Sequence, residues 1–199
     1  MTPDEIAKSY DQLADLWNSH DFPRASGIEQ HDRAIAFVKE RRRALDVGCG
    51  SSGRIIDHLS SHGFRVEGLD VSPRMIELAR TRHPDTVFHQ ADITDWEFPR
   101  KYDFISAWDS IWHVPLADHE RVLTKILQGL ETGGVCIFTI GGLDAPGEKV
   151  DAAMGPPMYY SVLGIPKTLQ LIADNRCVCR HLQYDQHPEL HLYIVAQRI

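Results

Sequence analysis

Three glycines and one acid in residues 45–54 have a spacing that suits ligand binding at the start of a helix. The segment reads Leu-Asp-Val-Gly-Cys-Gly-Ser-Ser-Gly-Arg, so Gly48, Gly50 and Gly53 follow an apolar run. Glycines let the backbone turn sharply and come close to a ligand where a β-carbon would clash. Asp46 lies two residues before the first glycine, where its charge would repel a pyrophosphate and attract a cationic amine. The pattern therefore predicts a nucleotide-like ligand that carries a positively charged amine.

A second acid, Asp70, ends the next apolar run. Asp70 closes the segment Arg-Val-Glu-Gly-Leu-Asp, at about 20 residues from the loop, where an acid can reach ribose hydroxyls. Ser72 and Pro73 suit the cap and the first position of a helix over 72–80, which would begin beside an adenosine. A glycine pattern alone also fits a purely structural turn, and Asp70 favours the ligand site over that alternative.

The two motifs resemble those of the class I S-adenosylmethionine-dependent methyltransferases, and the likeness covers most of the chain. In that family the first motif looks like Leu-Asp-Val-Gly-Cys-Gly and the second like Gly-Leu-Asp-Val-Ser-Pro-Arg-Met. The resemblance implies S-adenosylmethionine as the cofactor, with its methionine part at the first motif, its ribose at Asp70 and its adenine at Asp92. It also places Tyr10 near the methionine carboxylate. The cofactor-binding residues that we expect are Asp46, Gly48, Cys49, Gly50, Asp70, Val71, Met75, Asp92, Ile93, Trp108 and Tyr10.

The segment after the fourth predicted strand, residues 107–115, is expected to form the floor of the reaction chamber. Methyl transfer from a sulfonium is an in-line displacement, so the site must align the acceptor and exclude water. Trp108 and Trp112 could enclose the acceptor and favour a cation with their ring faces, or pack as core residues. His113, with an ordinary pKa of about 6.5, is the expected general base. Asp109 is the second catalytic candidate, to bind an acceptor amine, to support His113 or to serve a structural role.

Two further segments are expected to cover the site. Residues 141–166 are rich in glycine and proline and read as a long loop, which would be a substrate lid or ordinary packing. Helix-spaced apolar residues within 1–28 predict an N-terminal helix and linker that cover the cofactor, although packing alone could also explain them. The acceptor-binding residues that we expect are Trp17, Trp112, Tyr159 and Tyr160.

No metal site is expected. Metal-assisted methylation would need several carboxylate and amide ligands at the ends of strands four and five, and the chain offers Asp109 and then two glycines. Pro188 separates His187 from His191 and argues against one shared helical face.

The remaining sequence alternates predicted strands and helices, as expected of a mostly parallel sheet with helices on both faces. The fold class is α/β, Rossmann-like and doubly wound, and the resemblance implies an antiparallel C-terminal strand. We interpret residues 1–199 as a single methyltransferase domain. The predicted strands are 43–48, 65–70, 86–90, 102–108, 134–140, 176–184 and 190–197, and helices are expected after the glycine loop and over 72–80 and 116–130.

The composition and net charge limit the classes of molecule that the protein is expected to bind. The 199 residues are 43% hydrophobic, enough to bury one core without disulfides, and the four cysteines match neither a disulfide framework nor a zinc motif. The formal net charge of -7 opposes binding to nucleic acid. No apolar stretch approaches the roughly 20 residues of a membrane span, and the N-terminus lacks the features of a signal peptide. We therefore expect a cytoplasmic monomer or homodimer that acts on a small-molecule acceptor.

The leading hypothesis is methyl transfer from S-adenosylmethionine to a small oxygen, nitrogen or sulfur nucleophile, with release of S-adenosylhomocysteine. A non-catalytic regulatory module that binds S-adenosylmethionine is the first alternative. A nicotinamide-dependent oxidoreductase is the second, and Asp46, Asp92 and the single-domain length argue against it.

Overall fold

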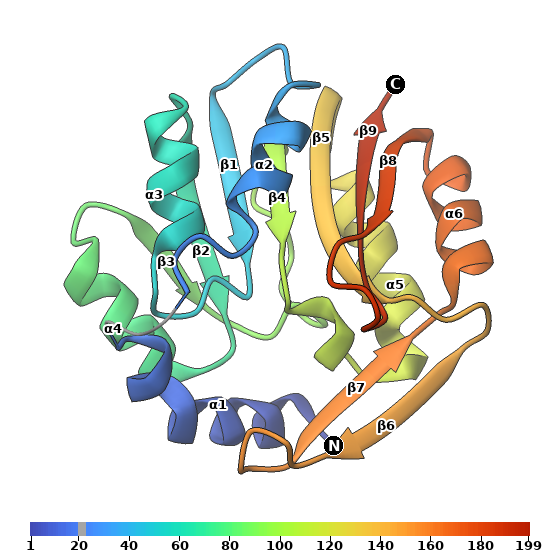
Figure 1. The fold of residues 1–199 in the computed structure, drawn as a ribbon. Helices are drawn as coiled ribbons and strands as arrows, with labels where there is room; N and C mark the ends of the chain where they lie inside the picture. The colour runs from blue at the N-terminus through green and yellow to red at the C-terminus, as the bar shows by residue number, and fades with distance from the viewer. Residues whose placement is uncertain (20–22) are drawn as a thin grey trace.

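The computed structural model describes residues 1–19 and 23–199, and its centre is a seven-stranded sheet (Figure 1). The strand order is β3–β2–β1–β4–β5–β9–β8. Neighbours from β3 to β5 pair in parallel, and β9 pairs antiparallel with both β5 and β8. The predicted α/β class and antiparallel C-terminal strand are confirmed. The strands are β1 (Arg43–Val47), β2 (Arg65–Asp70), β3 (Val87–Gln90), β4 (Tyr102–Ala107), β5 (Leu130–Gly141), β8 (Cys177–Tyr184) and β9 (His191–Arg198).

Helices cover both faces of this sheet because each strand alternates its side chains between two cores. In β1, Leu45 and Val47 belong to one core cluster and Ala44 to the other. The first cluster packs against α5 and α6, and the second against α2, α3 and α4. The helices are α1 (Pro3–Trp17), α2 (Ile28–Ile35), α3 (Arg54–Ser61), α4 (Pro73–Arg82), α5 (Leu116–Gln128) and α6 (Ile165–Asp174), with a short 3-10 helix η1 at Ile111–His113.

The boundaries of β5 differ from the predicted strand 134–140. The strand begins at Leu130, which already pairs with Tyr102, and a register shift follows before Phe104 pairs with Val135. The consecutive glycines at 133 and 134 lie in this irregular stretch of the ladder.

Residues 141–166 are not the structureless loop that their glycines and prolines suggest. They contain an antiparallel hairpin of β6 (Gly147–Asp151) and β7 (Met158–Val162), and α6 begins at Ile165. The Gly and Pro residues lie near the ends of these elements. Tyr159, Tyr160 and Val162 of β7 favour a strand, whereas β6 has only Val150 of that kind and is set by its pairing with β7. The predicted cover is therefore a hairpin.

The hairpin and α1 lie side by side at the carboxyl ends of the parallel strands (Figure 1). Helix α1 starts with a capping box, in which the Thr2 hydroxyl accepts from the Glu5 amide and the Glu5 carboxylate accepts from the Thr2 amide. The Ser9 hydroxyl donates to the Pro157 carbonyl at 2.7 Å and joins the helix to the start of β7. Within residues 1–19 and 23–199, no helix combines the length and apolar character needed to cross a membrane.

Candidate active site

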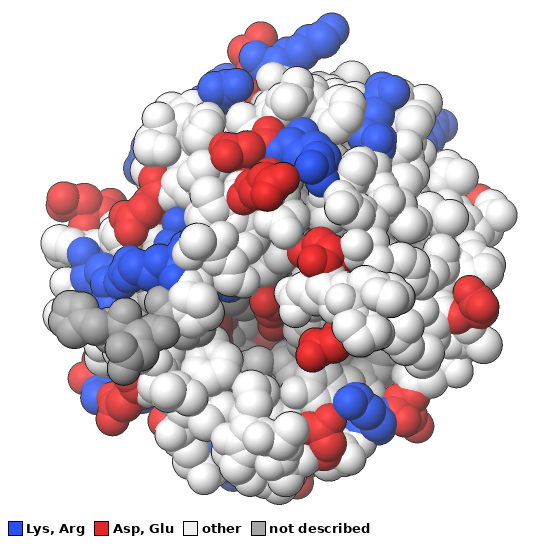
Figure 2. Space-filling model, viewed as in Figure 1, with Lys and Arg blue, Asp and Glu red and all other residues white. Residues whose placement is uncertain are grey.

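A cavity of about 630 Å³ opens where β1, β2, β3 and β4 end. Residues of α1 and Tyr160 of β7 form part of its wall. Figure 2 shows this face hollowed near its centre, with acidic atoms inside the hollow. Cavities that hold small molecules and cofactors span about 300–1,000 Å³, so this one has a suitable size.

The predicted site residues converge on this cavity from six separate stretches of chain. All of them line it except Asp46 and Tyr159. The predicted residues that line it are Tyr10, Trp17, Gly48, Cys49, Gly50, Asp70, Val71, Met75, Asp92, Ile93, Trp108, Asp109, Trp112, His113 and Tyr160.

The glycine loop is tightly packed at one glycine and open at another. Gly48 has a φ of +72°, and a β-carbon there would lie 2.2 Å from the β-carbon of Ser110. A β-carbon on Gly50 would meet only the Trp17 ring, at 3.9 Å. The loop is therefore pressed against the end of β4 at Gly48, and the space above Gly50 belongs to the cavity.

Asp70 ties the loop to the start of α4. Its Oδ2 accepts from the Gly50 amide and its Oδ1 from the Ser72 amide, each at 2.9 Å. The Ser72 hydroxyl caps α4 by accepting from the Met75 amide at 3.0 Å, and it donates to Asp11 at 2.5 Å. Burial raises the pKa of Asp70, and the backbone donors oppose that shift. The carboxylate is thus fixed in the cavity wall at the end of β2.

Asp46 lies beneath the loop and does not line the cavity. Burial raises the pKa of this carboxyl to about 7; Ser106 and the charge of Arg54 lower it, and the charge of Asp70 raises it. A cation above the loop would favour the ionised form of such a group. Asp46 would therefore attract a cationic ligand electrostatically across the glycine loop, without direct contact.

Arg54, the first residue of α3, lines the cavity although the sequence analysis assigns it no role. Its Nε donates to the Ser26 carbonyl at 3.0 Å and its Nη1 to the Ser52 hydroxyl at 3.2 Å. Burial lowers its pKa, and the charges of Asp109 and Asp46 oppose the shift. The available signal is an arginine directly after the third glycine, where the N-terminus of a helix already favours anions.

Asp92 is oriented by its own turn after β3. The amide and hydroxyl of Thr94 donate to its two carboxylate oxygens at 2.8 and 2.6 Å. Ile93 and Val71 add apolar surface to the same cavity.

His113 is built into a hydrogen-bonded wall, which argues against its predicted role as general base. Its Nδ1 donates to the Tyr159 carbonyl at 2.7 Å, because a carbonyl only accepts. Its Nε2 carries the lone pair and accepts from the Tyr10 hydroxyl at 2.7 Å and the Trp112 Nε1 at 3.0 Å. Burial lowers the pKa of His113 to about 4. The neutral ring therefore positions Tyr10 and Trp112, and its lone pair is already occupied.

Tyr159 points away from the cavity, whereas Tyr160 lines it. Successive side chains of a strand face opposite sides, and both residues lie in β7. The Tyr159 hydroxyl donates to Glu148 at 2.6 Å and accepts from the Leu116 amide at 3.0 Å. The predicted contact of Tyr159 with the acceptor is therefore corrected to a structural role, in which its carbonyl holds His113.

Aromatic rings surround the end of the cavity that α1 and β7 cover. The rings of Tyr10 and Trp17 lie 6.2 Å apart, and those of Trp112 and Tyr160 are also separated by 6.2 Å. Trp108 is only 4% exposed, and its Nε1 has no hydrogen-bond partner among the described residues. The cavity thus combines apolar walls with a few directed polar groups.

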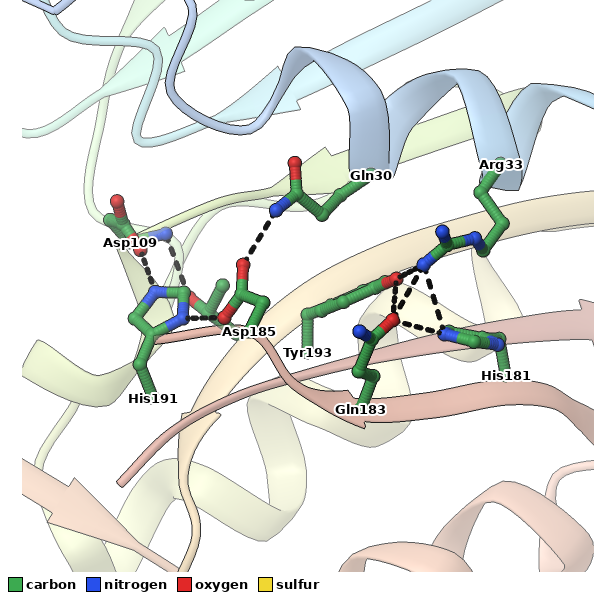
Figure 3. Close-up of polar contacts among 9 residues, drawn as sticks. Gln30, Arg33, Asp109, His181, Gln183, Asp185, His191 and Tyr193 are labelled. Atoms are coloured by element: carbon green, nitrogen blue, oxygen red, sulfur yellow. Dashed lines mark hydrogen bonds and ion pairs between the residues drawn. The ribbon is translucent and has the colours of Figure 1, made fainter. Parts of the chain in front are cut away.

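A triad that the sequence analysis does not predict lies at the same end. His191 of β9 contacts Asp185 through Nδ1 at 2.5 Å and Asp109 through Nε2 at 2.9 Å, as Figure 3 shows. Gln30 of α2 donates to the second oxygen of Asp185 at 2.7 Å. The only sequence signal is the presence of histidine and acids near the end of the chain, since Asp109 and His191 are 82 positions apart.

One cluster with the ligand types of a metal site lies outside the cavity, on α2 and α3. The ligand atoms of Asp32, His58 and His62 lie within 4.8 Å of one another. Both imidazoles face the same carboxylate oxygen of Asp32, at 2.8 Å and 3.5 Å, as ion pairs would.

Known proteins resemble this chain in sequence and in fold. Residues 44–134 match the family model of a methyltransferase domain. A trans-aconitate 2-methyltransferase of Rhizobium etli is 37% identical over 101 residues, which cover 49% of this chain and 38% of that protein. A dTDP-3-amino-3,6-dideoxy-alpha-D-glucopyranose N,N-dimethyltransferase of Streptomyces fradiae is 34% identical over 116 residues, 55% of this chain and 42% of that protein. The chain thus spans less than half the length of these curated relatives.

Solved structures share the whole fold. DhpI, solved as a complex with SAH, superposes with a TM-score of 0.70 at 21% identity and covers 98% of this chain and 96% of its own. The sugar N-methyltransferase KedS8 from Streptoalloteichus sp. gives a TM-score of 0.69 at 19% identity and covers 92% and 91%.

The sheet order, the glycine loop and the acid at the end of β2 define a Rossmann-like protein with a site for a nucleoside-type cofactor. Residues 44–134 are similar to a methyltransferase domain, and the relatives and solved structures above support the resemblance to the class I S-adenosylmethionine-dependent methyltransferases. The resemblance stated from the motifs is confirmed, and S-adenosylmethionine is the cofactor of this family.

Proposed function

We propose that this chain transfers the methyl group of S-adenosylmethionine to a small-molecule nucleophile and releases S-adenosylhomocysteine. The observation that carries the proposal is one cavity that joins the motif residues of the family to an aromatic end under α1 and β7. A site for the cofactor and a site for an acceptor would therefore be continuous.

The residues present fit the cofactor. Asp70 presents a fixed carboxylate at the end of β2, and Asp92 presents another at the end of β3. Asp46 and Arg54 flank the glycine loop with opposite charges, which suits the amine and the carboxylate of a methionine group. The open space above Gly50 allows close approach of a ligand to the loop backbone.

When bound, S-adenosylmethionine supplies a methyl group on a sulfonium sulfur. The protein's part is to align the acceptor with that methyl group and to exclude water. Tyr10 and Trp112 are held over the cavity by His113, and Tyr160 joins them from the hairpin. These rings form an apolar wall that excludes water, and their faces favour a nearby cation.

The names of the relatives do not indicate one acceptor chemistry. They include a methyltransferase of trans-aconitate, an N,N-dimethyltransferase of an amino sugar and a methyltransferase of 27-O-demethylrifamycin SV. The nucleophile must therefore be inferred from this chain's own residues.

The test is calorimetric titration with S-adenosylmethionine and S-adenosylhomocysteine, with NADH as the control. We expect binding of both adenosyl ligands at micromolar concentration and none of NADH. A panel of small amines, alcohols, thiols and carboxylic acids is then incubated with enzyme and S-adenosylmethionine, and S-adenosylhomocysteine is measured. Binding without turnover on any acceptor would favour a regulatory module, and a preference for NADH would contradict the assignment.

A further inference from the structure

Asp109 has a backbone conformation that few residues other than glycine adopt. It follows β4 by two residues and has a φ of 53°. Its amide donates to the Thr139 hydroxyl at 2.7 Å, a contact that holds this conformation. Strain of this kind persists where neighbouring contacts enforce it, and it concentrates at functional sites. The side chain is 34% exposed and lines the cavity, so the fold presents a carboxylate to whatever occupies this end.

His191 is a cation held between two acids. Both of its ring nitrogens face carboxylates, so both must donate and the imidazole must be charged. Burial acts to lower its pKa, but the hydrogen bonds and charges of Asp109 and Asp185 outweigh it and raise the pKa. The triad therefore carries two negative charges and one positive charge, a net charge of minus one.

One other cation of the cavity wall, Arg54, interacts with Asp109 through its charge, and the acidic lining residues outnumber it. Among the lining residues that the structure describes, four are acidic and one is an arginine or lysine. That residue, Arg54, is bonded to Ser26 and Ser52 beside the glycine loop. The acidic lining residues are Asp70, Asp92, Asp109 and Glu189. Because the family resemblance uses Asp70 and Asp92 for the cofactor, two acids are left for the acceptor.

Aromatic rings lie beside His191, the partner of Asp109. The Trp112 ring lies 5.6 Å from the His191 ring and 6.2 Å from the Tyr160 ring. Acidic groups with aromatic faces recognise organic ammonium ions through charge and through the ring quadrupole. Figure 3 shows Asp109 and Asp185 on opposite sides of His191, reached from β4, the segment before β9 and β9 itself.

We propose that Asp109 binds the nitrogen of the acceptor, and that this acceptor is a small amine with an aromatic or apolar group. The proposal rests on methyl transfer as the proposed function and names the substrate class of that site.

The charge movement of the reaction agrees with this assignment. The acceptor ammonium first releases one proton to solvent, and its nitrogen lone pair then forms the N–C bond. The S–C bond breaks with its electron pair left on sulfur, so the positive charge passes from sulfur to nitrogen. A carboxylate beside the nitrogen stabilises that arriving charge, and the product ammonium later releases its additional proton to solvent. The same carboxylate would repel a carboxylate acceptor.

The experiment measures binding of three matched compounds to the whole protein saturated with S-adenosylhomocysteine. The compounds are 2-phenylethylamine, 2-phenylethanol and phenylacetate, which share a skeleton and differ in charge. We expect the amine to bind more tightly than either partner by about tenfold or more, as a charge-assisted hydrogen bond provides. Equal affinities, a preference for phenylacetate, or no binding of the amine at millimolar concentration would overturn the proposal.

Asp109→Asn identifies the residue responsible. Asparagine tolerates the left-handed backbone and can still accept from His191, so the fold should persist. We expect the preference for the amine to fall by about tenfold or more while the affinity for S-adenosylhomocysteine changes little. Asp118→Asn is the matched control, because Asp118 has a side-chain exposure of 37% and pairs with Arg121 on α5 outside the cavity. A preference that survives Asp109→Asn, or that falls equally in Asp118→Asn, would contradict the proposal.

The two proposals fail separately. Absence of S-adenosylhomocysteine binding would contradict methyl transfer, and the amine preference can still be measured on the protein without it. Tight binding of S-adenosylhomocysteine with no amine preference would leave methyl transfer in place and remove the amine subsite.

Discussion

Asp70 serves the fold and the site with the same two oxygens. It accepts backbone hydrogen bonds from the glycine loop and from the start of α4, so its position is set before any ligand arrives. A preorganised acceptor loses little entropy on binding, which makes it an effective partner for ribose hydroxyls.

Asp70→Ala should weaken S-adenosylhomocysteine binding by about 1–3 kcal/mol, because charge-assisted hydrogen bonds to the ligand are lost. Calorimetry measures the change in Kd. Asp57→Ala is the control, since Asp57 is an acid of α3 with a side-chain exposure of 56%. Equal affinity in wild type and Asp70→Ala would contradict the site, as would an equal loss in Asp57→Ala.

Asp46 should make cofactor binding depend on pH. Its pKa is about 7 in the protein without ligand, and a bound ammonium favours the ionised form. Binding then releases a proton, so affinity should rise with pH up to about 7 and level above it, by as much as about tenfold per pH unit. The Kd of S-adenosylhomocysteine between about pH 5.5 and about pH 8 measures this. Asp46→Asn should flatten the curve, and a flat wild-type curve would contradict the account.

Local sequence indicated most of the residues that line the motif end of the cavity, and it missed contacts at the aromatic end. Asp46, Gly50 and Asp70 are recognisable because the loop, the strand and the next helix follow one another within a short stretch. The role of His113 depends on its neighbour Trp112 and on two partners from other elements, Tyr10 and Tyr159. His191 meets Asp109 only after β9 has paired beside β5, and no local spacing records that contact.

At the scale of elements, packing constrains the strand-to-helix turn after β1 at Gly48. Gly48 and Gly63 both have positive φ, of +72° and +91°. They differ in their surroundings, since nothing lies within 4 Å of a β-carbon on Gly63. The two positions therefore separate backbone strain from steric contact.

Gly48→Ala should lower the free energy of unfolding by more than Gly63→Ala. Both substitutions incur the left-handed strain of about 1–2 kcal/mol, and only Gly48→Ala adds the clash with Ser110. Urea denaturation of both variants gives the comparison, with an expected difference of about 1–3 kcal/mol. Equal losses of unfolding free energy in the two variants would show that the backbone at Gly48 shifts to relieve the clash, and would contradict the prediction.

The β6–β7 hairpin is the element that the sequence does not predict. Gly and Pro residues in 141–166 correctly indicate where elements end. The short strands between them are hard to predict from sequence, because a strand this short is stable only when paired. Once β6 and β7 pair, the alternation along β7 decides that Tyr160 and not Tyr159 lines the cavity. Because the sequence predicts a loop here, it does not indicate which side chains of β7 face the cavity.

At the scale of the whole molecule, buried histidines set the response to acid. His31, His113 and His119 are at most 8% exposed, and burial lowers the pKa of each to about 4 from 6.5. Between these values the unfolded chain binds protons that the folded protein does not. Each histidine therefore contributes stability that is complete above pH 6.5 and is lost as the pH falls to about 4, by about 3 kcal/mol.

Unfolding free energy should therefore fall by several kcal/mol between about pH 7.5 and about pH 4.5. Asp46, Asp70 and His191 act in the opposite direction, because their raised pKa values let the folded state bind a proton first, and Asp46 alone offsets about one histidine. Urea midpoints across this range measure the slope. His119→Asn should reduce it, since His119 contacts Ser161 away from the motif residues. A stability that stays constant over the range would contradict the role of the histidines.

The hydrogen bond from Ser9 to Pro157 joins positions 148 apart in the chain. During synthesis, α1 emerges long before its partner β7, and at roughly 5–20 residues per second the wait is on the order of ten seconds. Throughout that interval α1 can pack against α4 but lacks its contact with β7. The cover of the cavity is therefore completed only after the hairpin has been synthesised.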